Sequence, residues 1–188
     1  TARDMAKISK AALENETFRY VACKPNYYIA PTNKDKHGKE LWNHHKMVKR
    51  TMFNYDGVEG GKTGYTTKAG GTLVTFAKRG DQELIVVDLC AHGYELYEDT
   101  IKMLNYGFNN YKTIAPFKTM NTVLKDDTYG FLKTGNELSP YKIPLKHLND
   151  VTVMLEKNQS ASKLTYKCKD NKYIISYDGK QIGSVKLH

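Results

Sequence analysis

The sequence predicts an α+β domain, an antiparallel sheet with helices, followed by a small all-β domain. Two apolar runs rich in β-branched residues, 72–77 and 84–87, are separated by a polar turn at 78–83. This pattern is typical of consecutive antiparallel strands. Apolar residues recur at helical spacing in residues 97–111, and beyond Pro116 short β-like runs follow at regular intervals. The helix would pack on the sheet of the first domain, and the runs would form the second.

The first segment predicts a short amphipathic helix over residues 2–13. Met5, Ile8 and Ala12 are three and four positions apart, and Thr1 precedes them as an N-cap.

Shorter signals complete the expected elements. A second helical turn is expected at 15–20, and residues 27–29 form a strand that ends at Pro31, which resists a ladder. Asp178-Gly179 is a strong two-residue hairpin signal. The other expected C-terminal strands are 122–124, 129–132, 151–155, 164–166, 173–177 and 182–185.

Composition limits the class of protein. The 188 residues carry 29 Lys and Arg against 20 Asp and Glu, a net charge of +9, so the surface should attract polyanions. The three cysteines are far apart and form no Cys-x-x-Cys pair, which favours neither a disulfide framework nor a zinc site. His44 and His45 are adjacent, a spacing that does not favour a metal site. No metal and no cofactor is expected.

No apolar run reaches the ~20 residues of a membrane span. The chain begins at Thr1 without a signal segment, so a mature or cut product is expected.

The chemistry-bearing stretch is Lys62-Thr63-Gly64, on or beside the first strand of the expected meander. An ammonium and a hydroxyl pointing the same general way, next to a residue without a side chain, can dock a peptide carboxylate. A second copy, Lys133-Thr134-Gly135, precedes Asn136 and is interpreted as a hairpin turn.

The surroundings of the first copy carry a family resemblance. Residues 57–66, then Ala69-Gly70-Gly71, residues 84–87 and Asn105-Tyr106-Gly107-Phe108 closely resemble the D-alanyl-D-alanine carboxypeptidases. These are low-molecular-mass penicillin-binding proteins of the serine acyltransferase class. The resemblance covers about residues 1–113 and implies a β-lactamase/transpeptidase-like antiparallel sheet with helices, of which the chain holds only part.

The resemblance implies a site and its ligands. Lys62, Thr63, Gly64 and Thr66 would bind the substrate, and the main-chain N–H of Tyr65 would be an oxyanion donor. The substrate would be a peptidoglycan stem peptide ending in D-Ala-D-Ala, β-lactams would also bind, and the location would be extracytoplasmic.

The family's Ser-x-x-Lys nucleophile motif and its Ser-x-Asn motif should both precede Lys-Thr-Gly. Here Ser139 and Ser160 begin Ser-x-x-Lys matches, but both follow it in the β-rich segment, and Ser-x-Asn is absent. The nucleophile and general base are therefore expected outside this chain, on an N-terminal portion of the same protein that would be its partner. The chain alone should be inactive, and apolar surface near Val58, Leu73 and Phe76 should be uncovered.

Two positions depart from the family pattern. His45 stands where an Asn-x-Asn stretch has its second Asn, and Leu96 stands where related enzymes carry an arginine that helps hold the substrate carboxylate. The favoured function is a serine-type D-Ala-D-Ala carboxypeptidase. A non-catalytic cell-wall binding or scaffold relative is the first alternative. A nucleic-acid-binding module, suggested only by charge, is a weaker one, because no recognition motif accompanies it.

The expected domain limits are 1–113 for the C-terminal part of the catalytic domain and 114–188 for a small β-sandwich-like domain. Asp88 interrupts an apolar strand end, and we expect it to reach solvent. Membrane association would require a segment that this sequence does not contain.

Overall fold

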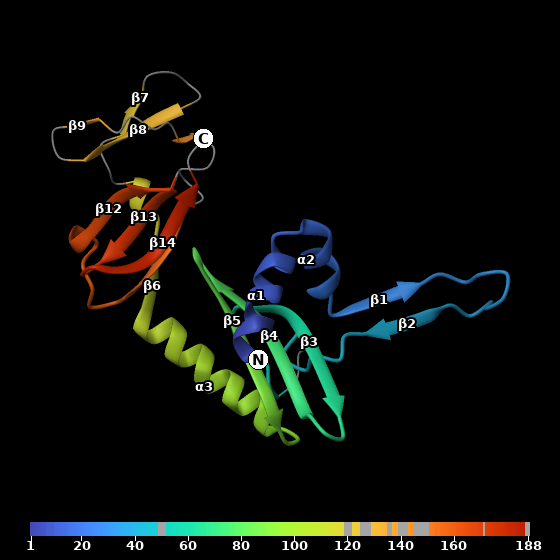
Figure 1. The fold of residues 1–188 in the computed structure, drawn as a ribbon. Coiled ribbons are helices and arrows are strands. Elements are labelled where there is room, and N and C mark those ends of the chain that lie inside the picture. Colours follow the sequence, from blue (N-terminus) through green and yellow to red (C-terminus); the bar gives the residue numbers. More distant parts are fainter. Residues whose placement is uncertain are drawn as a thin grey trace. The chain divides into compact units, whose positions relative to one another are not determined.

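The computed structural model describes residues 1–48, 52–118, 122–124, 129–134, 137–138, 143–144, 151–170 and 172–186. The chain forms two compact units, Thr1–Asn109 and Asn110–His188 (Figure 1). That residues 1–113 and 114–188 are separate domains stays a prediction.

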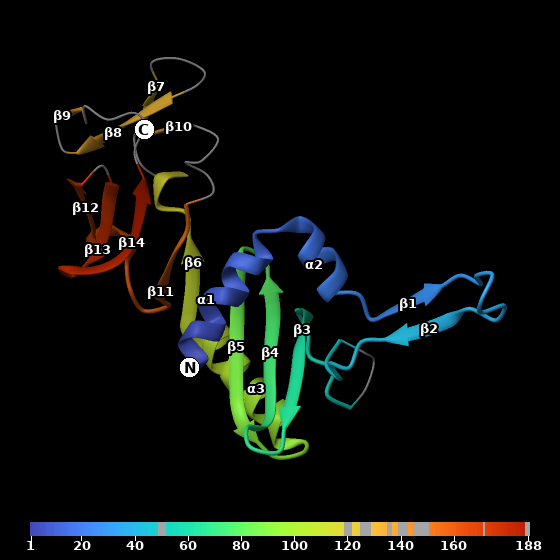
Figure 2. The same ribbon diagram turned by 45° about the vertical axis from the view of Figure 1, so that its right-hand side comes forward.

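The first unit is built on an antiparallel meander with the order β3-β4-β5. Its strands are β3 (Val58–Thr66), β4 (Gly70–Arg79) and β5 (Gln82–Ala91), which lie side by side in Figure 2. The expected meander is confirmed, but the turn is shorter than predicted. Lys78 pairs with Glu83 and Arg79 with Gln82, so polar ends prolong both strands.

Helices cover both faces of this sheet. In β4, Leu73 and Ala77 belong to a buried cluster with Leu104 of α3 (Glu95–Asn110). The alternate residues Val74 and Phe76 pack with Leu13 of α1 (Ala2–Leu13). Successive side chains of a strand leave on opposite faces, so the apolar run of β4 is the mark of a strand buried on both sides.

The two N-terminal helices begin where the sequence predicts. The Thr1 hydroxyl accepts from the Asp4 N–H, and the Asp4 carboxylate reaches back to the Thr1 amine, which forms a capping box. Asn15 caps α2 (Glu16–Ala22) by accepting from the Phe18 N–H at 2.9 Å. Both caps satisfy backbone donors that a helix cannot use internally.

The expectation of uncovered surface near Val58, Leu73 and Phe76 is wrong. Leu73 is 1% exposed and Phe76 is 2% exposed, while Val58 is partly buried against the cluster that contains Leu73. The helices of this same unit cover these side chains.

Exposed apolar side chains gather instead on a two-stranded hairpin, β1 (Asn26–Ile29) paired with β2 (Lys39–Trp42). The strand at 27–29 is confirmed, and β2 was not predicted. Every residue of both strands is exposed. Figure 1 shows this hairpin projecting from the sheet of the first unit.

In the second unit, β6 (Tyr111–Ile114) pairs with β11 (Val153–Glu156). Another antiparallel sheet consists of β12 (Leu164–Lys169), β13 (Lys172–Tyr177) and β14 (Lys180–Lys186). Its core contains Leu155 and Ile175. Asp178 and Gly179 both have positive φ and join β13 to β14, which confirms the predicted hairpin. The remaining elements are η1 (Pro116–Lys118), β7 (Thr122–Leu124), β8 (Tyr129–Thr134), β9 (Glu137–Leu138), β10 (Ile143–Pro144) and η2 (Ala161–Lys163).

In the second Lys-Thr-Gly copy, Lys133 pairs with Leu138 and Thr134 with Glu137. The expected turn residues Gly135 and Asn136 lie outside the described residues, as does Ser139.

Candidate functional site

Lys62-Thr63-Gly64 lies on β3, which ends the order β3-β4-β5 and, within the described ranges, pairs with β4 alone. Lys62 is opposite Val74 and Thr63 is opposite Leu73. The two side chains therefore leave the strand on opposite faces. The expectation that the Lys62 ammonium and the Thr63 hydroxyl point the same general way is therefore not met in this register.

A groove of about 350 Å³ runs beside this strand. We call it the strand groove. Thr63, Gly64 and Tyr65 of β3 form one side. The Lys62 side chain does not line the groove, and its ammonium donates a hydrogen bond to the Thr63 carbonyl oxygen. The other lining residues are Lys46, Gly71, Thr72, Ala91, His92, Gly93, Tyr94, Leu96 and Tyr97.

The two residues after the triplet differ in their surroundings. The Tyr65 side chain is 76% exposed. The Thr66 hydroxyl accepts from the Ala69 N–H at 3.0 Å, which stabilises the turn between β3 and β4. Thr66 therefore has a local structural role besides any contact with a ligand.

Leu96 and Lys46 differ in the charge that they bring to the groove. Leu96 is buried at the start of α3 and packs so closely on Gly71 that a Cβ added there would lie 2.7 Å from its Cδ1. It places no charge in the groove. Lys46 does, with its ammonium 4.3 Å from the centre of the Tyr94 ring. Sequence reasoning missed Lys46, for which the only signal was its position beside His45.

His45 supports β3 from within the core. The side chain is fully buried, and its Nε2 lies 2.9 Å from the Thr75 hydroxyl of β4. Its Nδ1 has no partner among the described residues. Burial lowers the pKa of His45 from 6.5 to about 4, because desolvation disfavours the charged imidazole. The ring is therefore neutral at pH 7.

The residue before Lys62 is packed on this ring. A Cβ added at Gly61 would lie 2.0 Å from the Val74 carbonyl oxygen and 2.7 Å from Cδ2 of His45. Gly61 also has φ +156°, so only glycine allows β3 to pass this close to β4 and to the imidazole.

Asn43 anchors the approach to this network. Its side-chain amide donates to the carbonyl oxygens of Ala22 and Lys24, and its side-chain oxygen accepts from the His45 N–H. The position of His45 is therefore set by the end of α2 and the base of the hairpin.

Asp88 was expected to reach solvent, but one of its carboxylate oxygens is buried. It is opposite Leu73 on the face covered by α3, and its Oδ2 is a buried atom without a partner among the described residues. Burial raises the pKa of Asp88, and the nearby Asp99 carboxylate raises it further. Within the described ranges, no three His, Cys, Asp or Glu side chains gather as a metal-binding group.

An edge strand bearing Lys-Thr-Gly, in an antiparallel sheet with helices on both faces, defines a penicillin-binding, transpeptidase-like fold. The chain matches the solved structure of penicillin-binding protein 5 from Haemophilus influenzae with a TM-score of 0.62, over 100% of this chain and 54% of that one, at 23% identity. It matches a solved mutant of the Streptomyces K15 DD-transpeptidase with a TM-score of 0.51, over 57% of this chain and 42% of that one, at 30% identity.

Sequence comparison gives the particular family. A family model described as D-alanyl-D-alanine carboxypeptidase matches residues 1–93. The D-alanyl-D-alanine carboxypeptidase DacF of Bacillus subtilis is 28% identical over 193 residues, which cover 100% of this chain and 46% of the relative. DacC of Escherichia coli is 33% identical over 119 residues, 63% of this chain and 28% of the relative. Residues 1–93, just under half of the chain, are similar to the D-alanyl-D-alanine carboxypeptidase family, and the chain spans less than half the length of these curated relatives.

Proposed function

We propose that this chain supplies the Lys62-Thr63-Gly64 side of a serine-type D-Ala-D-Ala carboxypeptidase site. The full-length protein would remove the terminal D-alanine from peptidoglycan stem peptides through an acyl-enzyme. The observation that carries the proposal is the placement of this triplet on an edge strand beside a groove lined by Thr63 and Gly64.

The edge of β3 suits an extended peptide. A substrate backbone can pair with the unpaired side of an edge strand, as in other cases of strand addition. Gly64 would allow its close approach. The main-chain N–H of Tyr65 would donate to the oxyanion, a contribution of about 3 kcal/mol to transition-state stabilisation.

Several polar groups would hold the substrate carboxylate. Thr63 offers its hydroxyl in the groove, and Thr66 lies farther along the same strand. Lys62 would turn from the Thr63 carbonyl toward the bound carboxylate, a charge-assisted contact. Lys46 would supply the second positive charge in the absence of an arginine at Leu96.

The nucleophile and general base would come from an N-terminal portion of the protein. Ser160 is a poor substitute. Its hydroxyl lies 2.8 Å from that of Ser162 and accepts from the Ser162 N–H, at the start of the short helix η2 of the second unit. This chain alone should therefore neither be acylated by a penicillin nor hydrolyse a D-Ala-D-Ala peptide.

The proposal implies β-lactams as further ligands and an extracytoplasmic location, where the wall peptides are found. No helix among the described residues is long and apolar enough to cross a membrane.

A non-catalytic wall-binding relative is the second candidate. The observation that favours it is the buried, uncharged Leu96 at the groove, together with a Lys62 ammonium that bonds to its own strand. Such a protein would keep the strand groove without acyl transfer.

Acylation of the full-length protein by a fluorescent penicillin separates the two. Lys62→Ala should lower the acylation rate by at least ~100-fold, the range for loss of one preorganised electrostatic group. Lys133→Ala is the matched control, because Lys133 belongs to the same tripeptide in the second unit, and it should leave the rate unchanged. Equal effects of the two substitutions, or none from Lys62→Ala, would place the site elsewhere. No acylation of the parent protein would favour the non-catalytic candidate.

A further inference from the structure

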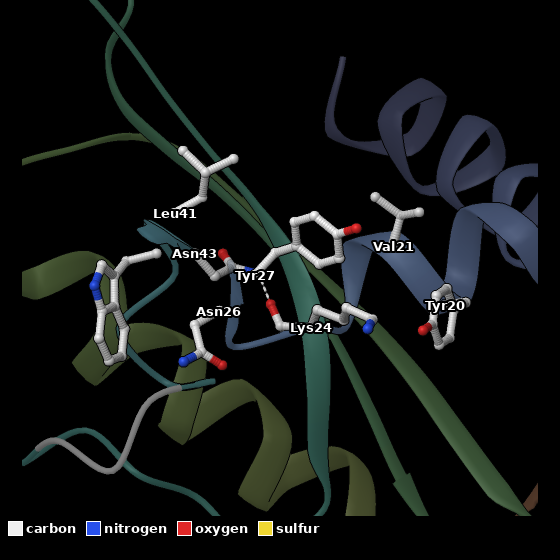
Figure 3. A pocket seen from close by; sticks show the side chains of 8 residues that line it. Tyr20, Val21, Lys24, Asn26, Tyr27, Leu41 and Asn43 are labelled. Carbon is white, nitrogen blue, oxygen red and sulfur yellow. Dashed lines mark hydrogen bonds between the residues drawn. The ribbon is translucent and has the colours of Figure 1, made fainter. Parts of the chain in front are cut away.

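A second cavity, of about 450 Å³, lies between the end of α2 and the base of the β1–β2 hairpin. We call it the hairpin pocket. Figure 3 shows its side chains, which come from α2, from both hairpin strands, from Lys24 between α2 and β1, and from Asn43 directly after β2. None of its lining residues also lines the strand groove. The hairpin pocket is therefore a separate concave site of the first unit.

Its walls are aromatic and open to solvent. Tyr20 is 64% exposed, Tyr27 56% and Trp42 52%, and Leu41, directly opposite Tyr27 in the hairpin, adds an aliphatic surface. Adjacent strand residues leave on opposite faces, so Tyr27 and Trp42 approach this cavity from different faces of the hairpin. Three large, exposed rings around one cavity are unusual for residues that normally pack in a core. Tyrosine and tryptophan, with an apolar body and a polar tip, suit ligands that are themselves apolar on one side and polar on the other.

One positively charged side chain of the pocket, Lys24, lies close to two of these rings. The Lys24 ammonium lies 4.3 Å from the centre of the Tyr20 ring and 5.4 Å from that of Tyr27, and its side chain runs between the two in Figure 3. The rings hold it by cation–π attraction. Within the described ranges it forms no salt bridge with a carboxylate.

The polar groups around the pocket are held in place. The Lys24 carbonyl accepts from the Asn43 side chain at 3.0 Å, the dashed line of Figure 3. The Asn26 amide donates to Glu40 at 3.2 Å, and Asn26 is directly opposite Trp42 in the hairpin. The site thus combines a fixed backbone at Lys24 with an amide beside an aromatic ring.

We propose that the hairpin pocket binds a pyranose that carries a carboxylate. A pyranose ring has an apolar C–H face, which would lie on an aromatic ring of the pocket, and a rim of hydroxyls and amides, which would bond to Asn26. The carboxylate would pair with Lys24, whose ammonium is preorganised by two rings and has no acidic partner in the pocket. The volume is in the range of sites for one small ligand, roughly 300–1,000 Å³.

The positive charge of the protein favours an anionic sugar over uncharged or cationic ligands that could also lie on an aromatic ring. The protein carries a net charge of +9, so an anionic sugar is attracted before contact. A cationic ligand is disfavoured, because Lys24 already occupies the space between the Tyr20 and Tyr27 rings. The proposal goes beyond the proposed carboxypeptidase activity and does not depend on it, since the pocket shares no lining residue with the strand groove.

Isothermal titration of the full-length protein with two closely related sugars tests the proposal. N-acetylmuramic acid and N-acetylglucosamine share the pyranose and the acetamido group, and only the first has a lactyl carboxylate. The acid should bind at least tenfold more tightly. Glucuronic acid, with its carboxylate on the ring, tests the alternative source of the same chemistry, and acetate tests the carboxylate alone.

Variants assign the contacts. Lys24→Met keeps the aliphatic stem and removes the charge, so it should abolish the preference for N-acetylmuramic acid and leave N-acetylglucosamine binding unchanged. Trp42→Ala should weaken both sugars at least fivefold. Lys34→Ala, at an exposed lysine in the loop of the same hairpin, is the matched control and should change neither.

Three outcomes would overturn the proposal. They are equal binding of the two acetylated sugars, equal binding of acetate and N-acetylmuramic acid, or no binding of any sugar at millimolar concentration. Each of these readings is independent of penicillin acylation, so the failure of one proposal is distinguishable from the failure of the other.

Discussion

The buried imidazole of His45 should make the stability of the first unit depend on pH between about 6.5 and 4. In the folded protein the pKa of His45 is lowered to about 4, whereas its ordinary value is 6.5. Between these two values the unfolded chain binds a proton that the folded chain refuses. The stability that the neutral imidazole contributes is therefore fully present above pH 6.5, is lost progressively as the pH falls from 6.5 to 4, and is gone below 4.

The size of the effect follows from the two pKa values. Linkage gives a loss of about 2 kcal/mol in the free energy of unfolding between pH 7 and pH 5. Asp88 acts with the opposite sign, because burial raises its pKa and a raised folded-state pKa favours folding at low pH. A comparison of variants at the same two pH values removes its contribution.

Urea unfolding at pH 7 and pH 5 measures this difference, with fluorescence of the single tryptophan, Trp42, as a reporter within the first unit. His45→Gln retains a polar group for Thr75 but does not titrate, so its stability should change by about 2 kcal/mol less between the two pH values than that of the parent. His37→Gln, at an exposed residue of the hairpin loop, should behave like the parent. If His45→Gln lost as much stability as the parent between pH 7 and pH 5, the imidazole would not be the source of the dependence.

Three further substitutions test the packing described above, each by chemical denaturation. Leu104→Ala removes a side chain with 0% exposure and should lower the free energy of unfolding by about 3 kcal/mol. Met103→Ala, at a residue of the same helix that is 39% exposed, should lower it by less than about 1 kcal/mol. Equal losses would contradict the assigned core face of α3. Gly61→Ala should destabilise at least twice as much as Gly80→Ala, because a Cβ at Gly80 meets nothing within 4 Å and bears only the strain of its positive φ. Arg19→Ala removes hydrogen-bonded ion pairs with Glu59 and Glu83, and since Arg19 is 31% exposed the cost should be about 1 kcal/mol and fall with added salt; a cost independent of salt would argue against ion pairing.

Local signals in the sequence predicted much of the first unit. Thr1 and the apolar spacing through Ala12 mark α1, and Asp178-Gly179 marks a turn, because capping and turn formation depend on a few neighbouring residues. The strands at 72–77 and 84–87 were located but underestimated in length. Their polar ends continue because Lys78 pairs with Glu83 across the turn, and such pairing is invisible in an apolar pattern.

What depended on distant contacts was missed. The strand β2 exists through its pairing with β1, which lies across a polar loop. The partner of His45 is Thr75, thirty positions away. Lys46 lines the strand groove because the fold brings it close to β3 and to residues 91–97, which lie far from it in the sequence. The triplet at Lys62 was identified by motif, but strand alternation set the directions of its side chains.

The double hydrogen bond from Asn43 to the end of α2 has a kinetic consequence. The carbonyl oxygens of Ala22 and Lys24 are satisfied by a side chain about twenty residues farther along the chain, and the loop between them must close before that bond can form. The last turn of α2 should therefore be completed late in folding. Truncation of Asn43 should then accelerate unfolding far more than it slows folding.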